Sequence, residues 1–265
     1  MTGLPRPAEP TAPAPAPAPG HAPLLSARRL AKDYGKLRVV SSLSFDVRAG
    51  EILGVIGPNG AGKTTLFALL SGYVAPTEGE VHLEGRPITG LRPDRRCHLG
   101  IARTFQIVRP FAELTVRENV AAAALFGKRE RRPSAEVARE VEEVLETTGL
   151  APQAAELART LSLPQRKRLE VARALATRPK VLLLDEVLAG LNPRAVEEAI
   201  PLIRTLNTAR GITVLMIEHN LRAILGLSHR VLVLNFGERI FEGTPAAAVE
   251  DPEVVRAYLG EATRA

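Results

Sequence analysis

Gly57-Pro58-Asn59-Gly60-Ala61-Gly62-Lys63-Thr64-Thr65 is the stretch that decides the fold, because its spacing is that of a loop that binds the phosphates of a nucleoside triphosphate. The loop follows a strongly apolar run at residues 52–56 and precedes apolar residues at helical spacing over 66–70. This motif requires a strand before the loop and a helix after it, and both are predicted here. The stretch therefore predicts an α/β protein that holds a nucleotide.

Each kind of residue in the loop has its own expected task. The glycines let the backbone turn tightly, so that successive N–H groups face one anion without a side chain in the way. The helix that begins near Lys63 adds its positive N-terminal end, and the ammonium group supplies a charge for the outer phosphates. The Thr64 hydroxyl is placed to bind Mg²⁺. The alternative is a purely structural glycine-rich turn, which the combination of Gly57, Gly62, Lys63 and Thr64 disfavours.

Composition limits the class of protein. A chain of 265 residues with 45% hydrophobic residues is long enough for one large α/β domain or two small ones. Residues 1–23 are Ala/Pro-rich and can neither pair in a sheet nor bury a core, so we expect a disordered tail followed by one folded domain over 24–262. No apolar run approaches the roughly 20 residues that cross a bilayer, and no secretory signal is visible, which favours the cytosolic side. The single cysteine, Cys97, is interpreted as structural.

The formal net charge of +6 would suit a nucleic acid or an anionic membrane surface. Arg and Lys groups recur at 92–96, 128–132 and 166–168, but acidic residues interrupt them. The chain also has no Trp and three Tyr, so it lacks the aromatic residues that interleave with basic ones on strand-binding surfaces. We interpret the basic groups as solvated helix faces and expect no nucleic-acid partner.

Apolar patterns predict that strands and helices alternate. Strands are expected at 25–30, 39–47, 51–56, 79–83, 181–184, 213–217, 230–235 and 239–242, and helices after the phosphate loop and at 134–147, 165–177, 194–208 and 252–259. The helix at 134–147 is amphipathic behind a Ser134 cap and lies within a helical insertion over about 91–178. Thr244-Pro245 and Asp251-Pro252 predict two further helix starts.

ATP hydrolysis needs more than a phosphate loop, because an acid must orient the metal and another group must polarise water. Residues 181–184 fit a parallel strand buried on both faces, and Asp185-Glu186 follow at its carboxyl end, where open α/β sheets bind their ligands. We assign Asp185 to Mg²⁺, through water, and Glu186 to the attacking water. The strand at 213–217 ends in Glu218-His219-Asn220, which places His219 at the same edge for contact with the outer phosphate; a structural histidine is the alternative.

The order of these motifs resembles the nucleotide-binding subunit of ATP-binding-cassette (ABC) transporters over about residues 25–260. Beside the phosphate loop, Asp185-Glu186 and His219, the shared motifs are Arg103-Thr104-Phe105-Gln106 and Leu161-Ser162-Leu163-Pro164-Gln165. The resemblance implies an α/β fold in which a RecA-like P-loop NTPase core carries an antiparallel β subdomain and a helical subdomain. It also implies ATP and Mg²⁺ as cofactors.

The same resemblance implies a set of site residues. Tyr34 would stack on adenine, Gln106 would link the metal site to a membrane subunit, and His219 would sense the outer phosphate. The implied nucleotide-contacting residues are Tyr34, Gly57, Pro58, Asn59, Gly60, Ala61, Gly62, Lys63, Thr64, Thr65, Ser162 and Gln165. The implied metal residues are Thr64, Gln106 and Asp185, and the implied catalytic residues are Glu186, His219 and Gln106.

Within that superfamily the chain looks most like an ATP-binding subunit of branched-chain (hydrophobic) amino-acid importers. The matching segments are residues 100–106, 189–193, 218–220 and 257–261, of which the first discriminates best. This resemblance implies a second, different ATPase subunit in a heterodimer, transmembrane permease subunits, and a separate solute-binding protein. It also implies a peripheral position on the cytoplasmic face of the inner membrane.

The chain departs from the family signature Leu-Ser-Gly-Gly-Gln, because Leu163 and Pro164 fill both glycine positions. In the family this segment binds the outer phosphate of ATP held by the other subunit. Proline offers no N–H, although it suits a first helical turn. We expect Ser162 and the amide of Gln165 to act as substitutes. Asn192, where many members have an acid, is a milder departure.

Three other functions fit parts of the pattern. An exporter ATPase, for example of lipopolysaccharide, has a similar cassette. A soluble ABC ATPase that acts on DNA or ribosomes normally has a coiled coil between the nucleotide motifs or a second cassette, and this chain has neither. A non-catalytic binding subunit is favoured only by Leu163-Pro164.

Overall fold

The computed structural model describes residues 22–106, 109–128 and 132–262, so the tail predicted at 1–23 lies almost wholly outside the described residues. The centre of the fold is a six-stranded sheet. The strands are β3 (Ile52–Ile56), β6 (Ile101–Arg103), β7 (Val181–Asp185), β8 (Thr213–Ile217), β9 (Arg230–Asn235) and β10 (Glu238–Gly243), in the order β10-β9-β3-β8-β7-β6. Neighbours pair in parallel, except that β10 is antiparallel to β9. Parallel strands of this kind need cover on both faces.

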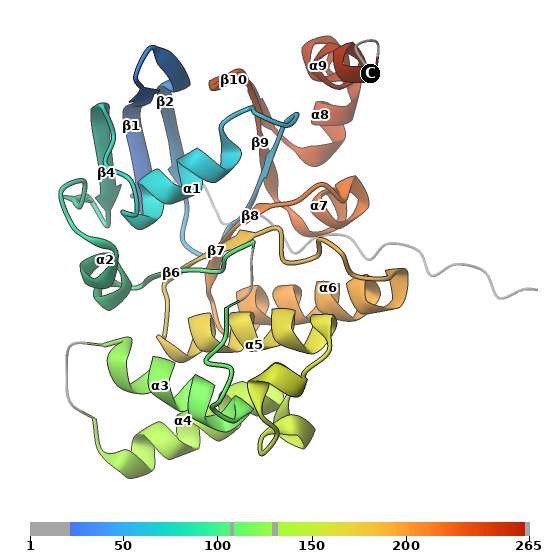
Figure 1. Ribbon diagram of the computed structural model, residues 1–265. Helices are drawn as coiled ribbons and strands as arrows, with labels where there is room; N and C mark the ends of the chain where they lie inside the picture. The colour runs from blue at the N-terminus through green and yellow to red at the C-terminus, as the bar shows by residue number, and fades with distance from the viewer. Residues whose placement is uncertain (1–21, 107–108, 129–131, 263–265) are drawn as a thin grey trace, which may run out of the picture.

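A second, antiparallel sheet covers one face of the central sheet. It contains β1 (Leu25–Tyr34), β2 (Leu37–Val47), β4 (Glu78–Leu83) and β5 (Arg86–Pro87), in the order β2-β1-β4-β5. Helix α1 (Lys63–Ser71) lies between the two sheets, where its leucines and Phe67 join one core with side chains from both (Figure 1).

Helices cover the other face and the edges. They are α2 (Pro93–Leu99), α3 (Val116–Phe126), α4 (Ser134–Thr147), α5 (Leu163–Ala176), α6 (Pro193–Thr208), α7 (Leu221–Leu227), α8 (Pro245–Glu250) and α9 (Pro252–Ala262), with 3₁₀ turns at Ala151–Gln153 and Ala158–Thr160. Helices α3, α4 and α5 pack together as a separate layer below β6 and β7 in Figure 1.

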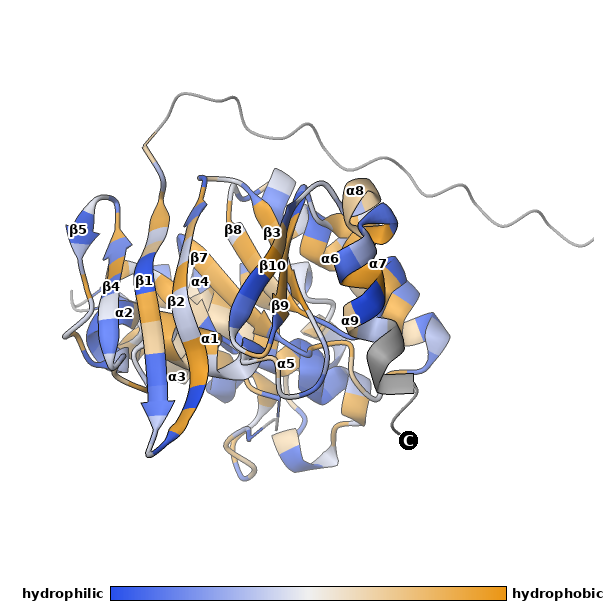
Figure 2. Cartoon of the chain, turned by 90° about the horizontal axis from the view of Figure 1, so that it is seen from above, coloured by the Kyte–Doolittle hydropathy of each residue, from blue (hydrophilic) through white to orange (hydrophobic). Residues whose placement is uncertain are grey.

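The central sheet separates two hydrophobic cores. Successive side chains of a strand point to opposite faces, so Val181 and Leu183 pack in the core with α1, whereas Leu182 and Leu184 pack in the core with the helices. Figure 2 shows the hydrophobic colour running along β3, β8 and β9 and the hydrophilic colour on outlying β5. The uninterrupted apolar run before Asp185 is therefore explained by burial on both faces.

The predicted strands and helices are confirmed, with differences at a few positions. The two helix starts occur at Pro245 and Pro252. The predicted Ser134 cap is wrong: Pro133 is the N-cap residue, Ser134 is the first helical residue, and no side chain caps α4. The range 91–178, expected to be helical, also contains β6, which pairs with β7 in the central sheet. Three residues are too few to show a strand period in the sequence.

Arg96 fixes the C-terminal end of the helix that follows the phosphate loop. This fully buried side chain of α2 donates to the carbonyls of Leu69 and Leu70 at 2.7 and 2.8 Å, in the last turn of α1. It also donates to Thr89 O at 2.7 Å and Leu91 O at 3.0 Å. Helix ends leave their last carbonyls without helical partners, and a guanidinium with several donors satisfies them here. Burial lowers the pKa of Arg96 to about 10, so it stays charged at neutral pH.

We expect Arg96→Met to lower the free energy of unfolding by about 3–5 kcal/mol, because it leaves several buried carbonyls without donors. Urea denaturation followed by circular dichroism measures this change. Arg95→Met is the matched control, because the neighbouring Arg95 is exposed and should cost no more than about 0.5 kcal/mol. Equal losses in the two variants would contradict this account of Arg96.

Candidate functional site

The phosphate loop joins β3 to α1 in a conformation that requires glycine. Gly57 has φ 149° and Gly62 has φ 96°, backbone torsions that residues with a side chain rarely adopt. A Cβ on Gly57 would lie 2.1 Å from the carbonyl oxygen of Leu234, and one on Gly62 would lie 2.6 Å from that of Val39. Close packing against β9 and β2 is thus a second reason for these glycines, in addition to the expected access for an anion.

Lys63 lies buried inside the loop. Its Nζ donates to the carbonyls of Gly57 and Pro58 at 2.6 and 2.8 Å. A cavity of about 190 Å³ lies beside it. The lining consists of Val39 and the predicted site residues Asn59, Gly60, Ala61, Gly62, Lys63, Thr64, Thr65, Glu186 and His219. The structure therefore brings the loop together with two residues that follow it by more than 120 positions.

Glu186 and His219 meet because β7 and β8 are parallel neighbours. Asp185 is paired with Ile217 in the register, so the residues after both strands emerge at the same edge of the sheet. Glu186 Oε1 lies 2.9 Å from His219 Nε2, and Glu186 Oε2 accepts from Gln106 Nε2 at 2.7 Å. The three predicted catalytic residues thus form one hydrogen-bonded group. Glu186 has φ 52°, a strained left-handed conformation for a residue with a side chain.

Asp185 has a partner that the sequence did not indicate. Its Oδ2 accepts from Arg103 Nη2 at 2.8 Å, and the two side chains are 2% and 8% exposed. Its backbone N–H donates to Thr104 Oγ1 at 3.0 Å. In the sequence, Arg103 stands out only as part of the motif at residues 103–106. No local sequence pattern indicates this pair, because it joins residues 82 positions apart.

The three predicted metal residues line a second cavity of about 480 Å³. Thr64, Gln106 and Asp185 offer hydroxyl, amide and carboxylate oxygens, which are ligands for a hard cation such as Mg²⁺. Among the described residues no three His, Cys, Asp or Glu side chains form a metal cluster. Because Mg²⁺ commonly takes one carboxylate and fills its shell with waters and phosphate oxygens, this donor set fits the ion.

Helix α5 contributes two buried side chains that hold the segments of Gln106 and Glu186. Lys167 Nζ donates to Gln106 O at 3.3 Å and to Glu186 O at 3.0 Å. Glu170 accepts from the N–H of Phe105, and burial raises the pKa of Glu170 to about 7 against that hydrogen bond. Neither residue was predicted from the sequence, which indicated only a basic helix.

Glu218 is a further buried acid at this edge. It accepts from Leu188 N at 2.8 Å, so it holds the segment just after Glu186. Burial raises the pKa of Glu218 to about 7, and the neighbouring Glu186 acts in the same direction. Its position directly after a buried strand was the signal available in the sequence.

The three predicted nucleotide residues outside the phosphate loop line neither of the two cavities. Tyr34 ends β1 with 49% of its surface exposed, and Lys32 Nζ lies 5.1 Å from its ring centroid. Ser162 is the N-cap of α5 and Gln165 lies in its first turn, where Gln165 Oε1 accepts from Ser162 N at 2.9 Å and from Ser162 Oγ at 2.7 Å. Pro164 occupies the first turn, so the helix end is intact despite the altered signature. The roles of Tyr34, Ser162 and Gln165, like those of the other predicted site residues, stay predictions.

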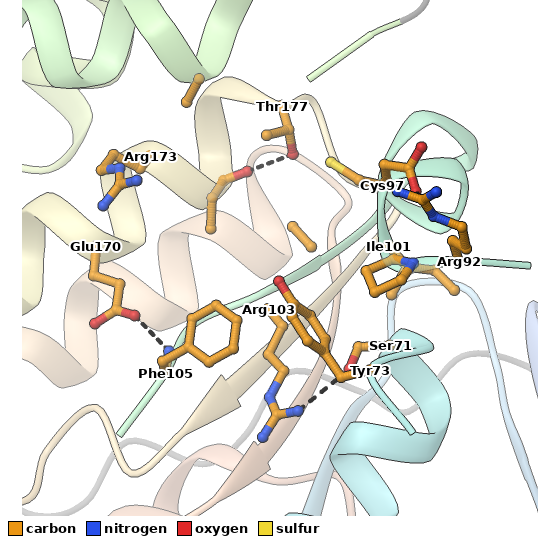
Figure 3. Close-up of a pocket in the computed structure, with 15 residues that line it drawn as sticks. Ser71, Tyr73, Arg92, Cys97, Ile101, Arg103, Phe105, Glu170, Arg173 and Thr177 are labelled. Carbon is orange, nitrogen blue, oxygen red and sulfur yellow. Dashed lines mark hydrogen bonds and ion pairs between the residues drawn. The ribbon is translucent and has the colours of Figure 1, made fainter. Parts of the chain in front are cut away.

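An outer cavity of about 510 Å³ adjoins the metal-side cavity (Figure 3). The two cavities share Arg103, Phe105, Glu170 and Arg173 in their lining. Tyr73 and Cys97 are among the other lining residues, and burial raises the pKa of the Cys97 thiol, in keeping with an unreactive side chain.

Comparison with known proteins gives consistent matches. Residues 40–189 match the family described as ABC transporter, and residues 238–263 match the branched-chain amino acid ATP-binding cassette transporter family. The high-affinity branched-chain amino acid transport ATP-binding protein LivG of Salmonella typhimurium is 40% identical over 91% of this chain and 99% of its own length. The corresponding protein BraF of Pseudomonas aeruginosa is 38% identical over 91% of this chain and 99% of its own.

A solved structure of an ABC transporter's ATP-binding cassette in its ADP conformation has a TM-score of 0.82 and 32% identity, covering 91% of this chain and 100% of that one. A nucleotide-free ATP-binding cassette has a TM-score of 0.79 and 32% identity, with coverage of 89% and 99%. These likenesses confirm the predicted fold class.

Proposed function

Since this chain belongs to the ABC transporter family and matches ATP-binding subunits of branched-chain amino-acid transporters over most of its length, we infer that it is the ATP-hydrolysing subunit of an ABC importer. The observation that carries this function is the near end-to-end match to LivG and BraF. Such a subunit powers uptake through membrane permease subunits and does not itself touch the solute.

We propose that the phosphate loop holds the triphosphate, with Tyr34 against adenine. Lys63 faces the outer phosphates, and Thr64, Gln106 and Asp185 would hold Mg²⁺. When bound, that ion would neutralise charge on the outer phosphates. Glu186 accepts a hydrogen bond from the attacking water and positions it, and His219 donates to the outer phosphate. For the residues other than Tyr34, the support is the position of the loop, Gln106, Asp185, Glu186 and His219 around adjoining cavities and the hydrogen bonds of Glu186 to Gln106 and His219.

We also propose that a permease subunit docks over the outer cavity. The cavity shares Phe105, which precedes Gln106, with the metal-side cavity, so a partner there would lie close to the hydrolysis site. No helix in the described part of the chain is long and apolar enough to span a membrane. From the likeness to transport ATP-binding subunits, we propose a peripheral position on the cytoplasmic face, with a separate solute-binding protein on the far side. We propose no nucleic-acid partner.

We propose that a second, different ATPase subunit completes the sites. Ser162 and Gln165 would face ATP held by that partner, and Leu163 is 41% exposed beside them. Because Pro164 lacks an N–H, the composite site made with this signature would be the slower of the two.

The test of this function is reconstitution of the chain with its permease subunits and second ATPase in lipid vesicles. Leucine, isoleucine and valine uptake should require MgATP and the solute-binding protein. Uptake that proceeds equally without ATP would contradict the function. ATP hydrolysis that no amino acid stimulates would favour the exporter alternative.

We expect Pro164→Gly to raise ATP turnover of the complete complex about tenfold, because it restores one backbone donor worth about 1.4 kcal/mol at the transition state. We expect this increase in turnover to be smaller than the decrease caused by losing a donor outright, because Ser162 and the Gln165 amide already donate in the unaltered chain. Steady-state ATPase assays measure it. Pro245→Gly is the matched control, since it alters the first turn of α8 away from the site. Unchanged turnover in the Pro164 variant would mean that the signature is not limiting.

A further inference from the structure

Arg103 lies between the proposed metal site and the outer cavity. Its Nη2 donates to Asp185 Oδ2 at 2.8 Å and its Nη1 donates to Ser71 Oγ at 3.3 Å. The arginine and aspartate side chains are 8% and 2% exposed. A buried ion pair of this kind neutralises both charges, and removal of one partner leaves the other uncompensated.

Two aromatic rings hold the same guanidinium on its other sides. Its carbon lies 5.3 Å from the ring centroid of Phe105 and 5.9 Å from that of Tyr73 (Figure 3). The two rings contact each other edge to face, with centroids 5.3 Å apart. Both rings line the outer cavity and are partly exposed. Cation–π contacts therefore fix Arg103 where its guanidinium reaches Asp185.

The charges of the proposed magnesium ligands make this position important. Thr64 and Gln106 are neutral, so Asp185 is the one formal negative charge among the three. Arg103 already balances that charge and occupies one carboxylate oxygen. A divalent cation must therefore share Asp185 with the guanidinium or displace it, and either event weakens its binding.

We propose that Arg103 is a positioning residue that holds the Asp185 carboxylate and lowers the affinity of the nucleotide site for Mg²⁺, with Tyr73 and Phe105 fixing the guanidinium in place. This inference rests on the proposed magnesium site. It also means that a partner in the outer cavity could influence the magnesium site. Such a partner would cover Tyr73 and Phe105, and both rings contact the Arg103 guanidinium that binds Asp185.

The test measures magnesium dependence by binding rather than by turnover. A fluorescent ATP analogue is titrated onto the isolated subunit at a series of Mg²⁺ concentrations. Arg103→Met removes the guanidinium charge and keeps a side chain of similar length. It should lower the half-saturating Mg²⁺ concentration about tenfold. Thermal unfolding gives a second readout: the variant should lose stability without Mg²⁺ and recover more of it than the wild type when Mg²⁺ and ATP are added.

Arg92→Met is the matched control, because Arg92 also lines the outer cavity but is 84% exposed and pairs with Asp94. Its magnesium dependence should equal that of the wild type. If Arg103→Met does not fold, Arg103→Lys carries the test, since it keeps the charge without the planar fork and should lower the half-saturating concentration about threefold.

A double-mutant cycle with Asp185→Asn separates this role from a merely structural one. Without the carboxylate charge, Arg103→Met should cause no further change in magnesium dependence. An unchanged half-saturating concentration in Arg103→Met, or an equal shift in the Asp185→Asn background, would overturn the inference. The proposed function fails separately, if the wild-type chain does not bind the ATP analogue at all.

Discussion

Replacing Glu186 by glutamine is expected to reduce ATP hydrolysis by about 10²-fold or more while ATP binding is retained, as for the loss of a water-positioning base. Glutamine has nearly the same shape, and its amide can still form hydrogen bonds with Gln106 and His219, so the local structure should persist. Single-turnover hydrolysis and calorimetric ATP binding measure the two effects separately. Normal turnover in this variant would remove Glu186 from the mechanism.

Glu218→Gln is the matched control for that result. Glu218 is a buried acid at the same sheet edge, but it accepts from Leu188 N, and a glutamine side chain can keep that bond. We expect ATP hydrolysis by the Glu218→Gln variant to fall by less than about tenfold, because Glu218 orders the backbone near Glu186 and is not proposed to contact the attacking water. Equal losses in both variants would indicate a general disturbance of the sheet edge.

Replacing Lys63 by alanine is expected to weaken ATP binding by about 10²-fold, the effect of losing strong hydrogen bonds from a charged donor to phosphate. The amine also bridges two carbonyls of the loop, so the variant should lose some order there. Isothermal calorimetry with ATP in the absence of Mg²⁺ isolates the binding effect.

Lys180→Ala serves as the control for Lys63→Ala. Lys180 pairs with Glu84 just before β7, whereas the site lies after the carboxyl ends of the strands. Its ATP affinity should be unchanged. Unaltered affinity in the Lys63 variant itself would contradict the assignment of the phosphate loop.

The sequence predicted the central part of the site because those residues obey local rules. The loop at 57–65 has fixed spacing, and a strand buried on both faces reads as an uninterrupted apolar run, which located Asp185 and Glu186. The parallel arrangement of strands then predicts that His219 lies at the same edge.

The missing parts depend on contacts between distant segments. The Arg103–Asp185 pair joins residues 82 positions apart, and the Phe105–Glu170 bond joins residues 65 positions apart. No local pattern encodes either. The Ser134 cap was wrong because Ser and Pro are both common at helix starts, and their order alone does not fix which residue precedes the first turn.

Glu186 shows where selection for folding and selection for turnover oppose each other. Its left-handed backbone costs about 1–3 kcal/mol for a residue with a side chain, and glycine would relieve that cost. Yet glycine has no carboxylate to aim at water. The chain thus retains a locally unfavourable torsion at the position proposed to hold the attacking water, and on that proposal a variant relieved of the torsion would be more stable and less active.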